Sequence, residues 1–254
     1  MQLWTWHQAD QPFLTCALLP QPHGFFTKHF YPAAPEELVR AIANANTQVY
    51  RVKQVHSGDV LLTDSPQVPL PLADGMVTQQ PNQSVWACSA DCTPALIADV
   101  KTGQVAAVHA GWRGTAKQIV PAAVNRLRSQ GSQLPNIRIA LGPAIDGQVY
   151  QVGPDVASEV GATVAPTIDG EKLAEKALLD HLLTIKNPPL LSDRDPDRVR
   201  LDVRRINQMQ LLAMGLELAQ IAIAPHCTYQ EPENFFSYRR THEKKVQWAG
   251  IVSI

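Results

Sequence analysis

The chain has 254 residues and a formal net charge of −1, and 45% of its residues are hydrophobic. This composition predicts a globular protein with a substantial core and excludes global disorder. A charge near neutrality argues against a polyanion as the main partner, so we expect neither nucleic-acid nor membrane binding. The first residues lack the basic start and apolar run of a signal peptide, and four cysteines are too few for a disulfide scaffold. We therefore expect a cytoplasmic protein with reduced thiols, and the oligomeric state is left open.

The first half of the chain is predicted to consist mainly of strands. After a short helix at 36–47, strands are expected at 48–64 (two, around the turn Ser57-Gly58-Asp59), 83–91, 94–100 and 104–110. His56 falls at the end of the first strand of the 48–64 pair. The last two segments, joined by Lys101-Thr102-Gly103, predict a β-hairpin.

The second half alternates helices and strands. We expect helices at 114–131, 171–186 and 202–215, and strands at 137–144, 219–225 and 247–254. In the first of these helices Thr115 is a predicted N-cap, Gly131 a C-cap and Pro121 a kink. Single strands, hairpins and helices in this order favour a mixed sheet with packed helices in one α+β domain over residues 1–254. No glycine-rich nucleotide-binding loop follows a strand.

One cysteine and two histidines suggest a metal site at one end of the hairpin. If Val100 pairs near Val105, His109 lies opposite Ala95 or Leu96, at the end where Cys92 enters. His56 lies at another strand end, so it could join them. One thiolate and two imidazoles form a zinc site with an open fourth position, which is the catalytic arrangement.

Other interpretations of these residues compete. A buried cysteine is more often inert packing and a lone histidine more often hydrogen-bonded core, so spacing alone favours the packing interpretation. We expect Cys88 to be core, and His226-Cys227 could be a second ligand pair. Asp91 or Asp74 could orient a ligand imidazole.

Two segments suggest an anion site. The sequence Gly-Trp-Arg-Gly-Thr at 111–115 places Arg113 directly before a predicted helix start, where free N–H groups, the helix dipole and a guanidinium favour phosphate or carboxylate. A glycine turn with a solvated arginine explains the same segment. Arg239 and Arg240 follow aromatic residues in "ENFFSYRR", and they could form a second anion contact or a surface ion pair.

Several motifs together resemble the YfiH family, also called the laccase-domain or polyphenol oxidase family. They run in order through the chain: "QVHSGDV", "ADGMVT", "SADCTPALIAD", "VAAVHAGWRGT", "LGPAIDGQVYQVG", "CTY" and "FFSYRR". The resemblance implies a mixed α/β fold with His56, Cys92 and His109 as zinc ligands. It also implies phosphorolysis of purine nucleosides (adenosine, inosine, guanosine and methylthioadenosine) together with adenosine deamination. Phosphate and ribose would then bind beside Arg113, Gly114, Thr115, Arg239 and Arg240.

The chain departs from the family pattern in three places. The amino-terminal loop is shorter, the closing "TGR" after "SYRR" is "THEKK", and Gln151 stands where an acid is usual. If that acid moves a proton, deamination is in doubt here, because it needs a proton donor.

Two alternative functions follow from the same residues. Cys92 could be a thiolate nucleophile with His109 as base, in a metal-free amide hydrolase, and some family members resemble editors of peptidoglycan precursors. Copper-dependent phenol oxidation ranks lower because the chain has no His-x-His motif, although Cu²⁺ could occupy the zinc ligands.

Overall fold

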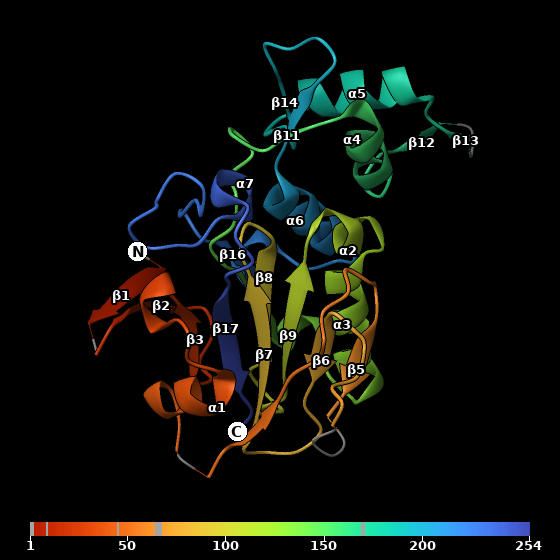
Figure 1. Ribbon diagram of the computed structural model, residues 1–254. Coiled ribbons are helices and arrows are strands. Elements are labelled where there is room, and N and C mark those ends of the chain that lie inside the picture. Colours follow the sequence, from red (N-terminus) through yellow and green to blue (C-terminus); the bar gives the residue numbers. More distant parts are fainter. Residues whose placement is uncertain (1–2, 9, 45, 64–67, 169–170) are drawn as a thin grey trace.

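The β-strands of this protein, in a computed structural model that describes residues 3–8, 10–44, 46–63, 68–168 and 171–254, form two six-stranded mixed sheets (Figure 1). The first sheet has the order β1 (Trp4–Gln8), β2 (Pro12–Cys16), β3 (His23–Phe26), β17 (Gln247–Val252), β7 (Gln83–Ser89), β4 (Gln48–Tyr50). The second has the order β16 (Ile221–Ile223), β10 (Ile137–Leu141), β8 (Thr93–Asp99), β9 (Val105–Ala110), β6 (Gly75–Val77), β5 (Val60–Leu62).

The central strand β8 shows why the sheets pack as layers. All seven of its residues are buried, and successive side chains point to opposite faces. Leu96 and Ala98 join the core between the two sheets, while Ala95 and Ile97 join a second core. That second core is covered by α3 (Ile119–Ser129) and α6 (Val203–Ala213). On the far side of the first sheet, α1 (Pro35–Leu38) and the 3₁₀ turn η2 (Val39–Ala41) pack on aromatic residues.

A smaller layer of helices and short strands stands at one end of the two sheets, at the top of Figure 1. It contains α4 (Pro154–Gly161), α5 (Glu175–Thr184), the sheet β11 (Gln151–Val152), β15 (Val199–Leu201), β14 (Leu190–Ser192), and the pair β12 (Thr167–Ile168) and β13 (Glu171–Lys172). Its apolar core also takes up Trp112 and Tyr150. The short helices α2 (Trp112–Ala116) and α7 (Tyr238–Thr241) lie between it and the sheets (Figure 1).

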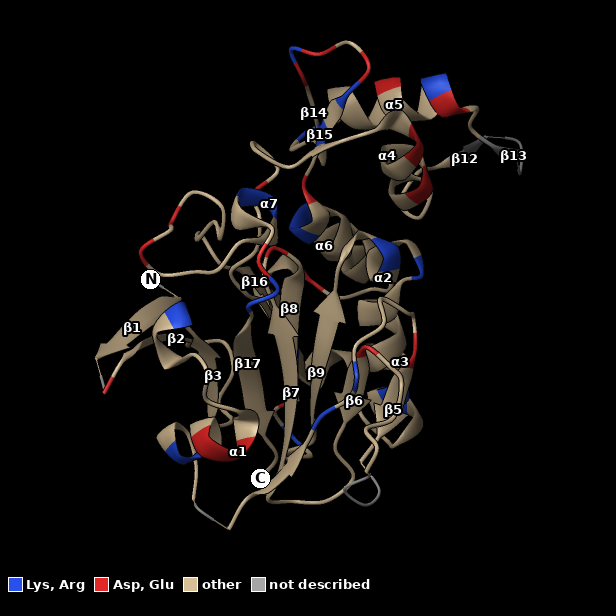
Figure 2. Ribbon diagram, in the orientation of Figure 1, with Lys and Arg blue, Asp and Glu red and all other residues tan. Residues whose placement is uncertain are grey.

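Charge is unevenly distributed near this end of the molecule. Figure 2 shows Lys and Arg on α2, α6 and α7, Asp and Glu on α4, and residues of both signs on α5. Within the residues described, no helix is long and apolar enough to span a membrane.

The mixed α+β class and most of the predicted elements are confirmed. The strands at 83–91, 94–100, 104–110, 137–144, 219–225 and 247–254 and the helix at 202–215 all form; the bounds are shorter than predicted, except those of β8, which are shifted by one residue. Asp202 caps α6 through a side-chain bond to the Arg205 N–H. The strands form two sheets and not the one that was expected, and the first of them is enlarged by β1 to β3, for which no strand was predicted.

Four local predictions are wrong. The two strands at 48–64 do not pair, because β4 joins the first sheet and β5 the second, and His56 lies in the connection between them. The hairpin register places Pro94, not Ala95 or Leu96, opposite His109. The helix at 36–47 ends by residue 41, and the helix at 171–186 begins only at Glu175.

The predicted helix at 114–131 is two helices. Gln118 has the left-handed φ of 55°, which ends α2 and begins α3. Pro121 therefore sits in the first turn of α3, where a missing N–H costs nothing, and it does not kink the helix. Thr115 lies inside α2, whose N-cap is Gly111. Gly131, with φ of 101°, follows the end of α3 as predicted.

Candidate metal centre and adjoining pocket

His56, Cys92 and His109 converge at one end of the second sheet. Their ligand atoms all lie within 4.8 Å of one another. Cys92 lies in the turn between β7 and β8, His109 near the end of β9, and His56 in the β4–β5 connection. The predicted meeting of three residues distant in sequence is confirmed, although His56 reaches the cluster from a loop.

Asp74 holds both histidines of this cluster. It is 1% exposed and directly precedes β6. His109 Nδ1–H donates to Asp74 Oδ1 at 2.8 Å. The same carboxylate accepts the backbone N–H groups of Val55, His56 and Ser57 at 3.1, 3.0 and 2.6 Å. Asp74 therefore leaves His109 Nε2 free for a ligand and fixes the loop that carries His56.

Backbone geometry around the cluster is strained in two places. His56 has φ of 59° and Asp91, before Cys92, has φ of 95°. Such conformations persist only where the surroundings enforce them, and they are frequent at functional sites. The Gln54 side chain supplies part of that enforcement, since it bonds both the N–H and the C=O of Cys88 at 2.8 Å.

The titration of Cys92 and His109 is coupled. Burial alone would raise the pKa of the Cys92 thiol, but the His109 imidazolium and hydrogen bonds from His109 and His56 lower it to about 6. Burial alone would lower the pKa of His109, but the Cys92 thiolate and Asp74 raise it to about 9. The thiolate is therefore the favoured form of Cys92 near neutral pH, as a metal ligand or nucleophile requires.

The donor set fits a divalent metal ion. A thiolate and two imidazoles are ligands that Zn²⁺ and Cu²⁺ both accept, and three protein ligands leave a position open. Gly111 leaves the necessary space, because a Cβ there would lie 2.7 Å from Cys92 Sγ. Within the described part of the chain this is the one cluster of His, Cys, Asp and Glu with suitable geometry.

The second predicted ligand pair, His226-Cys227, does not form a metal site in the described residues. His226 pairs with Glu231 at 2.9 Å. Cys227 is buried and accepts the Asp146 N–H at 3.3 Å. Both side chains thus serve the packing of the loop before α7.

A cavity of about 510 Å³ opens beside the metal cluster. It has a size usual for small-molecule sites. Two arginines on its wall are stacked on aromatic rings: the Arg113 guanidinium carbon is 4.2 Å from the Trp112 ring centre, and that of Arg239 is 4.9 Å from Tyr150. The complete lining is Gln54, His56, Cys88, Ser89, Ala90, Asp91, Cys92, His109, Trp112, Arg113, Tyr150, Tyr238, Arg239, Glu243, Lys244, Lys245 and Val246.

Three residues predicted to bind phosphate do not line this pocket. Gly114 and Thr115 are buried, and Thr115 Oγ1 accepts a bond from Asn207 of α6 at 3.0 Å. Arg240 donates to the backbone carbonyls of Thr228, Tyr229 and Phe235. These residues hold α2 and α7 in place, and the pocket contacts come from Arg113 and Arg239.

Two further expectations change. Cys88 is half-buried and lines the pocket instead of the core, and burial raises its pKa to about 12, so it stays a thiol. The Gln151 side chain is not part of the lining: its Nε2 donates to Asp193 at 3.0 Å. In this chain residue 151 therefore contributes no side chain to the lining of the pocket.

Sequence reasoning did not find Tyr150, Tyr238, Lys244 and Lys245 as pocket residues. They come from a connection before β11, from α7 and from the segment after α7. Nothing in their spacing links them to Cys92, because the tertiary fold alone joins these segments.

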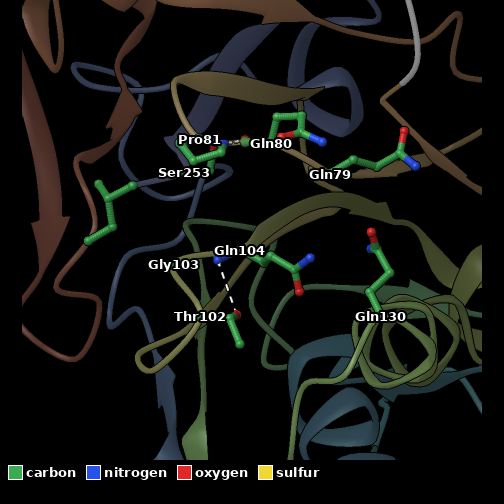
Figure 3. Close-up of a pocket in the computed structure, with 9 residues that line it drawn as sticks. Gln79, Gln80, Pro81, Thr102, Gly103, Gln104, Gln130 and Ser253 are labelled. Carbon is green, nitrogen blue, oxygen red and sulfur yellow. Dashed lines mark hydrogen bonds between the residues drawn. The ribbon is translucent and has the colours of Figure 1, made fainter.

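A second hollow, of about 150 Å³, lies at the opposite end of the β8–β9 hairpin (Figure 3). Amide side chains surround it, among them Gln79, Gln104 and Gln130 (Figure 3). Gly103, with φ of 79°, meets the carboxyl-terminal Ile254 there. No metal-binding cluster of described residues adjoins it.

Solved structures share this fold. YlmD from Geobacillus stearothermophilus superposes with a TM-score of 0.80 at 24% identity, over 98% of both chains. The hypothetical protein YfiH from Bacillus licheniformis superposes with a TM-score of 0.75 at 23% identity, over 91% of this chain and 92% of that one.

The sequence places the chain in a family. The family model described as multi-copper polyphenol oxidoreductase laccase matches residues 33–254, and the chain belongs to this laccase-type family, as its motifs predict. A relative from Synechocystis, named purine nucleoside phosphorylase slr1573, is 54% identical over 99% of this chain and 97% of that protein. A protein from an unknown prokaryotic organism, named adenosine deaminase RL5, is 31% identical over 70% of this chain and 60% of that protein.

Proposed function

We propose that this protein is a zinc-dependent purine nucleoside phosphorylase that also deaminates adenosine. The observation that carries the proposal is the His56–Cys92–His109 cluster at a pocket whose wall holds two pre-stacked arginines. The 54% identity to a relative named purine nucleoside phosphorylase, over nearly the whole of both chains, supports the same activity. We also propose a cytoplasmic location, where reducing conditions keep the four free cysteines as thiols.

His56, Cys92 and His109 would hold the zinc ion. Bound zinc supplies a Lewis acid and lowers the pKa of coordinated water towards neutrality, which is the chemistry that deamination uses. Asp74 keeps His109 in the tautomer with a free Nε2. Copper could replace zinc on these ligands, and the metal content of protein purified without added metal tests the assignment.

Arg113 and Arg239 bind phosphate in this mechanism. Guanidinium groups form paired, charge-assisted bonds to phosphate oxygens, and stacking on Trp112 and Tyr150 limits their rotamers before phosphate arrives. A phosphate oxygen attacks the ribose C1′, the C1′–N9 bond breaks, and its electron pair leaves with the purine. The proton released from phosphate ends on the departing base. Positive charge that develops on the ribose is stabilised by the bound oxyanion.

Product stoichiometry tests the proposal. The protein with inosine and phosphate should release hypoxanthine and ribose 1-phosphate in equal amounts. Release of hypoxanthine that does not depend on phosphate would falsify phosphorolysis. Arg239→Gln should raise the phosphate KM roughly 10-fold or more, since a hydrogen bond to a charged group contributes about 1.5–3 kcal/mol. Arg128→Gln, on the exposed face of α3, is the matched control.

A second candidate function is metal-free amide hydrolysis. The lowered pKa of Cys92 beside His109 favours it, because this pairing activates a thiolate nucleophile. If chelator-treated protein cleaves a peptidoglycan-precursor amide at the full rate while alkylation of Cys92 stops it, this function replaces the first.

A further inference from the structure

Asp91 links the metal cluster to the helix that carries Arg239. It directly precedes Cys92, is 9% exposed and has φ of 95°. Asp91 Oδ1 accepts the Thr228 hydroxyl at 2.8 Å, and Oδ2 accepts the backbone N–H of Arg239 at 2.7 Å. Its backbone carbonyl accepts the Ile145 N–H at 2.9 Å. One residue thus joins the Cys92 turn to three other segments of the chain.

The bond from the Arg239 backbone N–H to Asp91 holds α7 against the turn that carries Cys92. On its other side, the Arg239 guanidinium lies over Tyr150 and donates to the Gln151 carbonyl at 2.9 Å. The position of this cation is therefore set by two contacts in the small layer and by one carboxylate beside the metal ligand. Loss of the carboxylate removes the contact that relates Arg239 to Cys92.

The charge balance of the pocket agrees with an anion bound near Arg239. Four cationic side chains line it, from Arg113, Arg239, Lys244 and Lys245, against the two carboxylates of Asp91 and Glu243. Both oxygens of Asp91 are already engaged by donors. Its carboxylate is therefore suited to hold α7 and not to transfer a proton to a substrate.

We propose that Asp91 is a positioning residue for anion binding: it holds α7 so that the Arg239 guanidinium faces phosphate at a fixed distance from the metal ligands. This inference rests on the proposed function in its choice of phosphate as the anion. Asp91 contacts neither phosphate nor purine in this role, and it acts only through Arg239.

Two substitutions separate the effect of the Asp91 hydrogen bonds from the effect of its charge. Asp91→Gly removes both hydrogen bonds, and glycine accepts the left-handed backbone without strain. Asp91→Asn keeps an acceptor for the Arg239 N–H, can donate to Thr228 Oγ1, and also tolerates the positive φ. Asp197→Gly, in an exposed loop away from the pocket, is the matched control.

The experiment measures the dissociation constant of inorganic phosphate on zinc-loaded protein by calorimetry, together with the phosphate and inosine KM values. Asp91→Gly should weaken phosphate binding at least 10-fold and raise the phosphate KM by the same factor, with zinc content and inosine KM within about twofold of wild type. Asp91→Asn should restore both phosphate values. A purely structural role would instead lower kcat through a smaller active fraction and leave the KM values unchanged.

An unchanged phosphate dissociation constant in Asp91→Gly overturns the inference, and so does a failure of Asp91→Asn to restore it. If hypoxanthine release proves independent of phosphate, the proposed function fails, and the binding comparison still decides the role of Asp91.

Discussion

The replacement Asp74→Asn should disconnect two metal ligands at once. Four donors converge on this buried carboxylate: three backbone N–H groups at 55–57 and His109 Nδ1–H. An asparagine offers one oxygen, and its NH₂ group then faces the donors that the second oxygen accepted. At least two hydrogen bonds are lost, and each buried donor left without a partner costs about 1–3 kcal/mol.

Asp74→Asn should therefore lower the free energy of unfolding by about 2–6 kcal/mol, which is a large part of the stability of a typical domain. Zinc affinity should fall roughly 10–100-fold, the effect usual for loss of a carboxylate that orients a ligand histidine. Chelator competition measures the affinity, and urea denaturation of metal-free protein measures the stability. Asp59→Asn, at an exposed carboxylate nearby, is the control. Wild-type zinc affinity and stability in Asp74→Asn would refute the role assigned to this residue.

Three further results are expected. The φ of Gly111 is −73°, which suits alanine, so Gly111→Ala should keep the fold. Its new Cβ should push Cys92 Sγ away and lower zinc affinity about 10-fold. Zinc binding as tight as in the wild type would contradict the close approach of Gly111 to Cys92. Chelation should lower Tm by about 5–10 °C, reversibly with zinc, because a ligand at 100 times its Kd stabilises by about 2.7 kcal/mol; an unchanged Tm would argue against a tightly bound ion. Burial lowers the pKa of His23 below its usual 6.5. Below that pH the unfolded chain binds a proton that the folded protein excludes, so the free energy of unfolding should fall as the pH drops. His23→Gln should flatten this part of a pH series of urea denaturations, and an unaltered slope would show that His23 does not cause it.

The sequence predicts the elements that carry the chemistry better than their assembly. The hairpin at 94–110 forms because two nearly continuous apolar runs, buried on both faces, are joined by a glycine turn, and this local pattern brings Cys92 towards His109. The register error arose at the hairpin turn: Val105 pairs with Ala98 and not with Val100, and the bond from the Asp99 N–H to the Gln104 carbonyl continues this register into the turn. His56 could be proposed from its residue type and motif. Its position in a loop between the two sheets, however, depends on a hydrogen bond to Asp74, which lies 18 residues further along the chain.

The pocket was less predictable than the metal cluster. A glycine-flanked arginine indicates an anion site in any helix start, yet Gly114 and Thr115 turn inward because α6 packs against α2. Tyr150 enters the pocket only because α4, α5 and β15 build a separate core beside it. Contacts of this kind depend on how layers dock, and a single sequence carries no periodic signal for them.

The shared anchor of the two histidines limits how this centre can be altered. An engineer who wishes to exchange one imidazole for another donor cannot treat it as an independent part, because the carboxylate that orients one side chain also shapes the loop of the other. Retuning the ion preference thus calls for concerted changes at residues 56, 74 and 109. A single substitution at any of these residues should weaken metal binding before it changes which ion is preferred.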